Sequence, residues 1–511
     1  MFSRYCIIII GIIICLILFV KIISRKKLRL NNSRDYQLNW VSDVTKMDAR
    51  PMDKIFYVKS VKDVQDVIQS AKDASKKISI AGQRHSMGGH TITENGYLVD
   101  MKYMDRILHF DPNKHRITIE PGIMWSYLIK FLNRHGMSPM TLQSYSTFSV
   151  GGSISVNAHG ITNDYGIVES VLGIKLINHT GDIIYCSRRV NAKLFSLVIG
   201  GYGLFGIIVE VTLKVVPNCS LKMIDANLVM DTFWVEYLKA VDNPNINIRL
   251  GRINITNFDE IYLYIFDEIS TNVVSVLKQN PNEMSKGSQL MYKWLMPYRF
   301  GQKIRYTLEK LAGKPLDLNN NYDRNELLYE TATPMANLYN PIITLDCTHV
   351  LQEYFIPIDS FLEWMLHIKR FFHKRLFNKI SLLNITIRFV KKDNTTFLSY
   401  AKKDMFAFVF YYRIERDEEA DSELEMVHYT LTNIALKLGG TFYLPYRHHY
   451  SANQLMSAYP EIIDFFAAKQ VYDPDKLFTN MWYEHYNSAV KASSSVLANA
   501  ITPAIAGTSY G

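Results

Sequence analysis

A ten-residue stretch, Ala81–His90, carries residue types suited to binding a phosphorylated ligand. It holds three glycines, two histidines and one arginine, and it follows a short β-like run at residues 77–80. Glycine lets the backbone approach a ligand closely and adopt positive φ angles, and successive backbone N–H groups in a turn form an anion cradle. The pattern favours a loop that grips a phosphorylated cofactor and presents His85 to it. A glycine-rich surface turn would show the same pattern, so other stretches must decide.

A second stretch of glycine and hydroxyl residues, Ser149–Gly160, points to the same kind of ligand. Its small residues and alternating serines suit close packing of the backbone against a flat or phosphorylated molecule. A tight strand-turn buried in a core would have the same composition. Both interpretations stay open on the residues alone.

Residues 201–206 formally match the G-x-G-x-x-G dinucleotide fingerprint. That fingerprint requires a strand before it and a helix after it. Here the order is reversed, because residues 191–199 have a helical pattern and the β-branched residues 207–216 predict a strand. A nicotinamide site of the Rossmann type is therefore excluded, and the chain has no G-x-x-x-x-G-K-[ST] phosphate loop.

The elements that must position these loops alternate between strand and helix. Apolar residues at helical spacing predict a helix over residues 61–75. A second helix is predicted over residues 125–135 and ends at Gly136. Short apolar runs predict strands at residues 54–58, 78–81, 97–100 and 117–120.

Length and composition describe a large folded protein with a mildly basic body. The chain has 511 residues, of which 48% are apolar, and a formal net charge of +9. Six of the positive charges lie within the first thirty residues, and no basic stripe with interleaved aromatic residues indicates nucleic-acid binding. The five cysteines are too few and too scattered to predict a disulfide framework or a zinc site.

The N-terminus predicts a single-pass membrane anchor at residues 5–23, followed by a linker at 24–39. The apolar run is close to the ~20 residues that a helix needs to cross a bilayer, and no small-residue cleavage site follows it. The basic cluster at residues 25–29 outweighs Arg4, so the positive-inside rule predicts a main body on the cytoplasmic side.

Taken together, the three glycine motifs resemble those of the vanillyl-alcohol oxidase type of FAD-linked oxidoreductases, over roughly residues 41–486. The first motif resembles the family's G-x-G-H-S loop, the second runs from Ser149 to Gly160, and the third covers residues 200–208. The resemblance implies an α+β fold with a two-part PCMH-type FAD-binding domain at 40–218. It further implies an antiparallel-sheet substrate domain at 219–440 and a segment at 441–487 that returns to the flavin. The last stretch, 488–511, is rich in Ala and Ser and is expected to be a flexible tail.

The resemblance implies FAD as cofactor and leaves two modes of binding open. In the family, the histidine that corresponds to His85 often bonds covalently to the flavin, but here Arg84 replaces the second glycine of the motif. FAD could therefore be bound covalently through His85 or held without such a bond. The residues implied to contact FAD are Gly82, Gln83, Arg84, His85, Ser86, Ser149, Gly152, Ser155, His159 and Ile208.

Two stretches resemble substrate-facing strands of the family. Glu353, in the run 351–357, falls where relatives point an acid or amide at substrate, and Arg388 matches the arginine of an E-I-R strand in alditol and aldonolactone oxidases. Thr386 stands where those enzymes have a glutamate. Because side chains alternate along a strand, Thr386 and Arg388 are expected to share one face.

The segment 443–450 resembles the part of the family that returns to the flavin. Relatives that include decaprenylphosphoryl-ribose oxidase carry a lysine at the position aligned with Tyr446. Tyr446 and Arg447 are the candidates here to polarise a substrate oxygen or to stabilise reduced flavin. His448 and His449 lack a third ligand at zinc spacing, so no metal is predicted.

The resulting hypothesis is a membrane-anchored FAD-dependent oxidoreductase that oxidises a CH–OH group of a sugar, polyol or aldonolactone. A hydride would pass to flavin N5, and oxygen or a quinone-like molecule would accept the electrons. One alternative is a flavin reductase or dehydrogenase for a lipid-linked sugar or a sterol. Another is a flavin-binding protein without turnover.

Overall fold

The computed structural model describes residues 39–270, 275–277, 298, 300–304, 306, 321–330, 347–375 and 377–506. The predicted anchor at 5–23 and nearly all of the predicted linker lie outside these residues. None of the helices in the described part is long and apolar enough to cross a membrane. The described residues from Val41 onward belong to one compact unit, which contains the three sheets described below.

The first sheet is parallel, with strand order β3-β5-β4. It consists of β3 (Lys54–Tyr57), β4 (Ile78–Ala81) and β5 (Tyr97–Asp100). Helix α2 (Val61–Asp73) begins at Ser60, whose side chain accepts a hydrogen bond from the Asp63 amide, and buries Val64, Val67, Ile68 and Ala71. These elements confirm the predicted strand–helix alternation, and the first glycine loop starts where β4 ends.

The second sheet is antiparallel, with order β10-β9-β11-β7-β6 and with β8 paired to β11. Its strands are β6 (Ile107–Asp111), β7 (Arg116–Ile119), β8 (Met137–Pro139), β9 (Val171–Ile177), β10 (Ile183–Cys186) and β11 (Ile207–Pro217). Its helices are α3 (Trp125–Asn133), α4 (Val150–Ser155), η1 (Ile167–Ser170) and α5 (Ala192–Val198). As predicted, the 201–206 turn has a helix before it and a strand after it. The segment after Ser149 is the short helix α4, so the strand-turn alternative is wrong.

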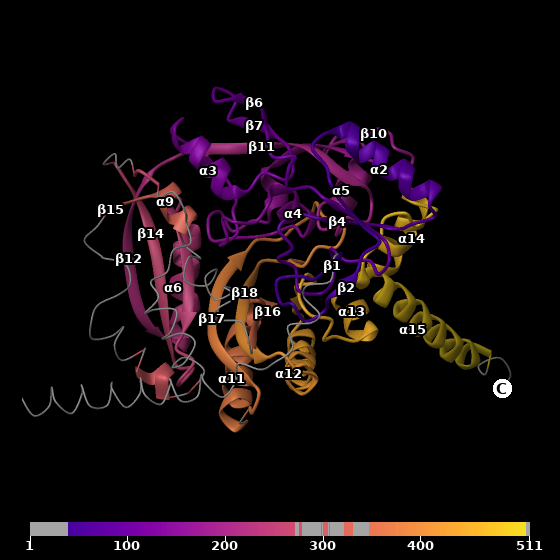
Figure 1. The fold of residues 1–511 in the computed structure, drawn as a ribbon. Coiled ribbons are helices and arrows are strands. Elements are labelled where there is room, and N and C mark those ends of the chain that lie inside the picture. Colours follow the sequence, from indigo (N-terminus) through magenta and orange to yellow (C-terminus); the bar gives the residue numbers. More distant parts are fainter. Residues whose placement is uncertain are drawn as a thin grey trace, which may run out of the picture. The chain divides into compact units, whose positions relative to one another are not determined.

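The third sheet has eight strands in the order β15-β12-β14-β13-β17-β18-β16-β19. They are β12 (Ser220–Val229), β13 (Ile246–Ile253), β14 (Glu260–Ile269), β15 (Asn321–Asp323), β16 (Cys347–Pro357), β17 (Ile380–Val390), β18 (Met405–Glu415) and β19 (Thr441–Phe442). All of its pairings are antiparallel, as expected for a substrate sheet. Helices α6 (Met230–Asp242), α11 (Phe361–Lys374) and α12 (Glu418–Lys437) pack on it (Figure 1).

Strand β16, which pairs with β18 and with the short strand β19, is buried on both faces. Every residue of β16 is buried. Tyr354 contacts Trp364 of α11, with ring centroids 5.3 Å apart. Because side chains alternate, the residues on either side of Tyr354, including Glu353, point to the opposite face.

The C-terminal segment returns to the first sheet. After α13 (Ala452–Ala458) and α14 (Ile462–Tyr472), Phe478 forms a parallel bridge with Ile78 of β4. Helix α15 (Met481–Ala506) covers most of the stretch 488–511, for which a flexible tail was expected. The remaining elements are β1 (Trp40–Val41), β2 (Arg50–Pro51), α9 (Arg324–Glu330) and η3 (Ile358–Ser360).

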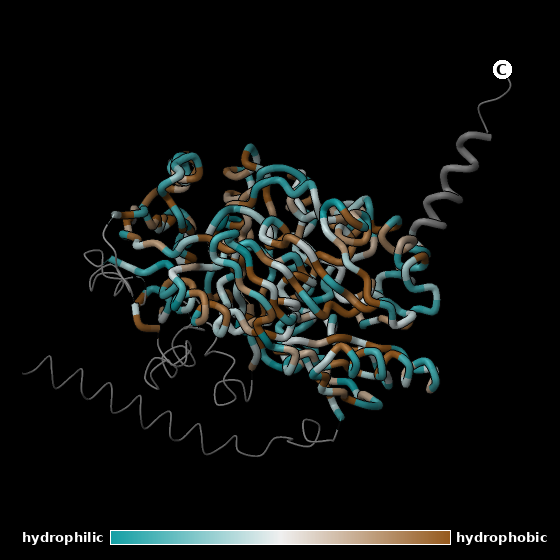
Figure 2. Tube along the Cα trace, turned by 90° about the horizontal axis from the view of Figure 1, so that it is seen from above, coloured by the Kyte–Doolittle hydropathy of each residue, from teal (hydrophilic) through white to brown (hydrophobic). Residues whose placement is uncertain are grey.

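One continuous cluster of buried apolar side chains reaches from the second sheet through the third and on to α15. Apolar stretches run along these packed strands and helices, whereas many connecting loops are polar (Figure 2). The loops that carry the glycine motifs are therefore held against the substrate-side strands by a shared core.

Candidate active site

A single large cavity brings the three glycine motifs together with the third sheet. Its volume is about 1,590 Å³, including space open to solvent. All ten residues predicted to contact FAD line this cavity, and so do Glu353, Arg388 and Tyr446. Arg447 does not line it.

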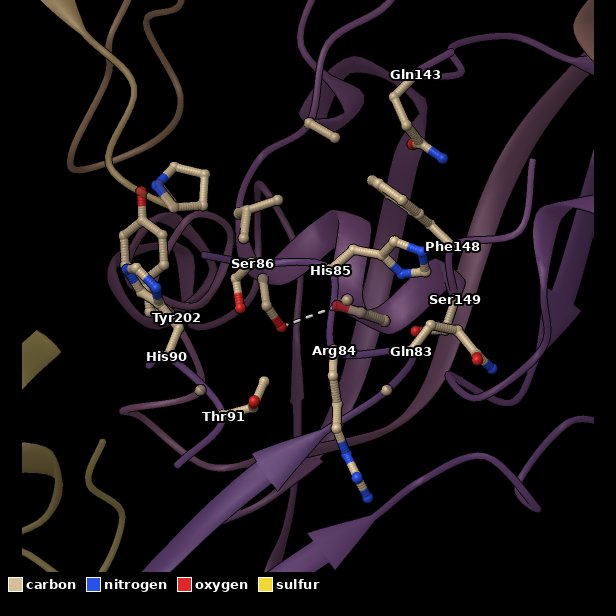
Figure 3. Close-up of a pocket in the computed structure, with 18 of the residues that line it drawn as sticks. Gln83, Arg84, His85, Ser86, His90, Thr91, Gln143, Phe148, Ser149 and Tyr202 are labelled. Carbon is tan, nitrogen blue, oxygen red and sulfur yellow. Dashed lines mark hydrogen bonds between the residues drawn. The ribbon is translucent and has the colours of Figure 1, made fainter. Parts of the chain in front are cut away.

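The loop after β4 keeps the backbone shape of a glycine motif although it contains Arg84. This residue has a φ of 56°, in the left-handed region that glycine adopts most easily. Its side chain points away from His85 (Figure 3), and Nη2 lies 2.6 Å from Oδ2 of Asp100. The replacement of the second glycine therefore leaves the loop folded and places the added charge on a buried carboxylate.

Gly82 allows the first and second motifs to touch. A Cβ atom at this position would lie 2.1 Å from Oγ and 3.2 Å from Cβ of Ser149, so a side chain here would displace the Ser149 hydroxyl. Ser149 is buried, and its Oγ has no hydrogen-bond partner among the described residues. The hydroxyl is thus free to bind a polar group in the cavity.

His85 projects toward Phe148 and Ser149 (Figure 3). Its ring centroid lies 4.2 Å from that of Phe148 and 6.3 Å from that of Tyr145. Burial lowers the pKa of His85 to about 4, so the ring is neutral near pH 7. Its Nδ1 is buried and unpartnered in the described structure. A neutral nitrogen of this kind can accept a hydrogen bond or bond to a cofactor carbon.

The third motif closes the cavity with backbone. Gly203 and Gly206 have φ angles of 75° and 139°, and Tyr202, which precedes Gly203, has a φ of 55°. Ile208, at the start of β11, is 7% exposed and lines the wall. Nδ2 of Asn480 donates a 2.9 Å hydrogen bond to the Tyr202 carbonyl, which anchors the turn to the C-terminal segment.

Strand register explains how the substrate-side residues meet. Val409 of β18 lies between Glu353 on β16 and Thr386 on β17, and Ala407 lies opposite Arg388. Thr386 and Arg388 are two residues apart on one strand, so they share the face that carries Glu353. Arg388 reaches the cavity, whereas Thr386 does not line it.

Arg388 and Tyr446 offer hydrogen-bond donors to a ligand. Nη2 of Arg388 donates a 2.7 Å hydrogen bond to Oγ of Ser144, its one hydrogen-bond partner within the described residues. Burial and the nearby Glu353 charge raise the pKa of Tyr446 well above its ordinary value. The phenol therefore stays protonated and can donate its O–H.

Glu353 also meets a residue of the second motif. Nε2 of His159 lies 2.7 Å from Oε1 of Glu353, and both side chains are 2% exposed. The resemblance implied an FAD contact for His159 and did not indicate this pairing.

Arg447, predicted as a catalytic candidate, lies outside the cavity. Its guanidinium forms ion pairs with Asp48 and Asp421, the second at 2.6 Å, and the side chain is buried. His449 contacts the same Asp421 at 3.1 Å. Both ends of the guanidinium are engaged by carboxylates outside the cavity, an arrangement that favours a structural role for Arg447 over the predicted catalytic one.

Several cavity residues were missed by sequence reasoning. They are Gln143, Ser144, Tyr145, Phe148, His90 and Tyr443. The polar and aromatic run 143–148 immediately precedes the second motif, and that adjacency was the only local signal. His90 and Tyr443 lie in stretches that were recognised for other residues.

The cavity fits a flat, phosphorylated cofactor such as FAD. Gly82, Gly152 and Gly203 line the cavity without side chains, so a ligand can approach their backbone closely. Buried polar atoms of His85, Ser149 and Gln143 lack partners within the described structure, and buried polar groups are rarely left unpaired. Exposed glycine backbone together with unpartnered buried polar atoms suits a ligand that has both an aromatic ring system and phosphates.

Comparison with known proteins agrees with this geometry. Residues 52–187 match the FAD binding domain family, and residues 327–486 match the D-arabinono-1,4-lactone oxidase family. L-gulonolactone oxidase from Bos taurus is 24% identical over 439 residues, which cover 84% of this chain and 94% of the relative. D-arabinono-1,4-lactone oxidase from Yarrowia lipolytica is 28% identical over 187 residues, 36% of this chain and 35% of the relative.

The chain belongs to the aldonolactone oxidase branch of the FAD-linked oxidoreductases. It is therefore an FAD-dependent oxidoreductase, as the three motifs implied. The match to the FAD binding domain family covers the parallel sheet and the first two glycine motifs. The second family match covers the strands that carry Glu353 and Arg388.

Proposed function

We propose that this oxidoreductase oxidises a hydroxyl-bearing carbon of an aldonolactone or a closely related sugar, with oxygen as electron acceptor. The observation that carries the proposal is the meeting of FAD-loop residues with Glu353, Arg388 and Tyr446 in one cavity. The names of the relatives, L-gulonolactone oxidase and D-arabinono-1,4-lactone oxidase, support the lactone class.

The chain's own residues divide the work of binding and proton transfer. FAD, when bound, supplies a hydride acceptor for the substrate carbon. Arg388 and the protonated Tyr446 donate hydrogen bonds to ring or carbonyl oxygens of the substrate and so fix its orientation. Glu353 receives the proton of the substrate hydroxyl as the carbon-bound hydrogen leaves. The apolar neighbours Leu351 and Val409 line the same space and exclude water.

The proposal is tested by adding L-gulono-1,4-lactone and D-arabinono-1,4-lactone to the purified flavoprotein. Without oxygen, a substrate should bleach the flavin absorbance. In air, turnover should release hydrogen peroxide. Bleaching without peroxide, with turnover restored by a quinone or dye, would identify a dehydrogenase. A flavin that no lactone, polyol or sugar bleaches would leave only a binding function.

FAD attachment through His85 forms a second part of the proposal. The neutral, unpartnered Nδ1 of His85 supports a covalent bond to the flavin. Acid denaturation of the wild-type protein should then leave the flavin with the precipitate. His85→Ala should release it, whereas Met87→Leu in the same loop should not. Yellow colour in the wild-type supernatant would exclude the bond.

Membrane anchoring through residues 5–23 forms a third part. The apolar run and the basic cluster after it support a single-pass segment with the body on the cytoplasmic side. The full chain should sediment with membranes and resist extraction by high salt, and a chain that begins at Asn39 should not. Protection of a C-terminal tag from protease in sealed cells would fit a cytoplasmic body, and its cleavage would reverse the orientation.

A further inference from the structure

His159 and Glu353 join the two sides of the cavity by one polar contact. His159 follows α4 in the second glycine motif, and Glu353 lies in the middle of β16. Nε2 and Oε1 are 2.7 Å apart, and both side chains are 2% exposed. Oε1 of Glu353 has no hydrogen-bond partner within the described residues, so this is a close approach of a ring nitrogen to a carboxylate oxygen rather than a hydrogen bond. Because burying a carboxylate away from polar groups is costly, the approach bears on where the Glu353 side chain rests.

The backbone that carries His159 is fixed from the substrate side. The Tyr400 hydroxyl donates a 2.8 Å hydrogen bond to the Asn157 carbonyl, and the Tyr443 hydroxyl donates one of 2.8 Å to the Val156 carbonyl. These bonds tie the second motif to the segments that flank β18 and β19. The position of His159 is thus set by elements other than its own loop.

Three aromatic rings enclose the imidazole itself. The ring centroid of His159 lies 5.4 Å from that of Phe355, 5.6 Å from that of Tyr400 and 5.9 Å from that of Tyr443. Such packing leaves the ring little freedom to rotate. The direction in which Nε2 points is therefore set by packing.

The other ring nitrogen has no competing partner. Nδ1 of His159 is buried and makes no hydrogen bond within the described residues. The polar contact of this ring inside the described structure is thus with Glu353, although the ring also lines the cavity.

We propose that His159 is a positioning residue for Glu353, and this inference rests on the proposed function. Its ring, fixed by packing, sets Nε2 against one carboxylate oxygen, and this contact orients the carboxylate so that the other oxygen receives the substrate proton. His159 does not need to touch the substrate for this role. The pairing also couples the cofactor loop to proton transfer, because the same residue belongs to the second glycine motif.

The test is a double-mutant cycle between positions 159 and 353 in the full-length holoenzyme. The single variants are His159→Phe, which keeps an aromatic ring but removes both nitrogens, and Glu353→Gln. Glu353→Gln should lower kcat on the order of 100-fold, and His159→Phe about tenfold with KM and FAD content little changed. The double variant should be no slower than Glu353→Gln alone, because a positioning residue acts only through its partner.

Two further variants separate positioning from packing. His159→Gln places an amide donor near the carboxylate and should recover most of kcat. His349→Phe changes another buried histidine, which lies on β16 and outside the cavity. It should leave kcat unchanged, even if it alters Tm.

The same double-mutant cycle can be measured by Tm, which does not require an active enzyme. If the contact exists, the fall in Tm of the double variant should be smaller than the sum of the two single losses. Additive losses in Tm and in kcat would overturn the proposal, as would loss of FAD on His159→Phe as the sole effect. A wild-type protein that oxidises no lactone would defeat the proposed function, and the Tm cycle would still decide the pairing.

Discussion

The two sides of the cavity bind by different means. The glycine-loop side presents backbone, because Gly82, Gly152 and Gly203 line the cavity without side chains. The third-sheet side presents side chains. Glu353 comes from β16 and Arg388 from β17, the two strands that flank β18. Contacts through backbone depend little on side-chain identity and suit a cofactor common to related enzymes. Contacts through side chains change with each substitution and suit recognition of a particular substrate. The comparison predicts that substitutions at the glycines of the first side affect FAD retention and that substitutions at the side chains of the second side affect turnover.

The largest effect is expected at Gly201. A Cβ atom there would lie 2.0 Å from the Leu197 carbonyl oxygen, which belongs to backbone and cannot move aside. Gly201→Ala should therefore destabilise the protein by more than about 4 kcal/mol and yield chains without FAD. Flavin absorbance per chain and a thermal melt measure both effects.

Gly152→Ala is the matched control on the same side of the cavity. Its Cβ would meet only the Ser149 hydroxyl, at 3.0 Å, and a hydroxyl can rotate away. We expect a folded protein with weakened FAD binding, because the added methyl group enters the cavity. Normal FAD content in both variants would contradict the assignment of this side to the cofactor.

Arg447 and Arg388 provide the sharpest contrast between structure and catalysis. Removing Arg447 leaves Asp48 and Asp421 without their shared cation. Because breaking a buried ion pair costs about 3–5 kcal/mol, Arg447→Ala should show a large drop in Tm. The fraction that remains folded should keep its kcat. A selective loss of kcat with unchanged Tm would restore Arg447 as a catalytic candidate.

Arg388→Ala should behave in the opposite way. The guanidinium lines the cavity and is held by Ser144, so its removal takes away substrate binding and leaves the cofactor side intact. We expect kcat/KM to fall about 100-fold, which corresponds to about 2.7 kcal/mol, at constant FAD content. Ser144→Ala should cost much less, since it only loosens the arginine. Steady-state kinetics on the active lactone provides the measurement.

The contrast also explains how far sequence could predict the site. The cofactor side could be read because each glycine motif is local: the residues that make the turn are neighbours in the chain, and all ten predicted contacts line the cavity. Even Arg84, a departure from the motif, adopts the left-handed backbone that glycine favours. The reversed order around residues 201–206 likewise followed from local periodicity.

The substrate side depends on pairings between distant segments, which no local pattern reveals. Arg447 stands beside Tyr446 in sequence, but its partners Asp48 and Asp421 come from an N-terminal loop and from α12. Tyr145 and Ser144 reach the site from a loop without a motif. His159 and Glu353 are nearly two hundred residues apart in the chain, so their contact forms only when the second glycine motif and β16 pack together.

The acidic residues around Arg447 predict a pH dependence of stability with two opposite signs. Although burial alone would raise the pKa of Asp421, its contact with His449 and the charge of Arg447 hold that pKa below its usual value. Asp421 thus contributes stability above its unfolded pKa of about 3.9, and this is lost as pH falls below that range. The Tm difference between wild type and Asp421→Asn should shrink from pH 7 towards pH 3.

Asp43 should contribute to stability with the opposite pH dependence. Burial raises its pKa to about 6, so it favours the folded state at low pH and loses that contribution as pH rises from about 4 to about 6. Asp43→Asn should therefore gain Tm relative to wild type at neutral pH and not at pH 4. Parallel Tm curves for all three proteins would mean that neither carboxyl has the environment described.

The smallest effect is expected at Tyr446, and it separates two roles on the substrate side. Burial and the Glu353 charge keep the phenol protonated at working pH, so Tyr446 can donate a hydrogen bond but cannot serve as the base. Tyr446→Phe should lower kcat/KM about tenfold, near the 1.4 kcal/mol of one neutral hydrogen bond. The pH–rate profile should keep its shape. If instead the alkaline limb disappeared in Tyr446→Phe, the phenol would be titrating in the reaction, and proton removal would have to be reassigned from Glu353 to Tyr446.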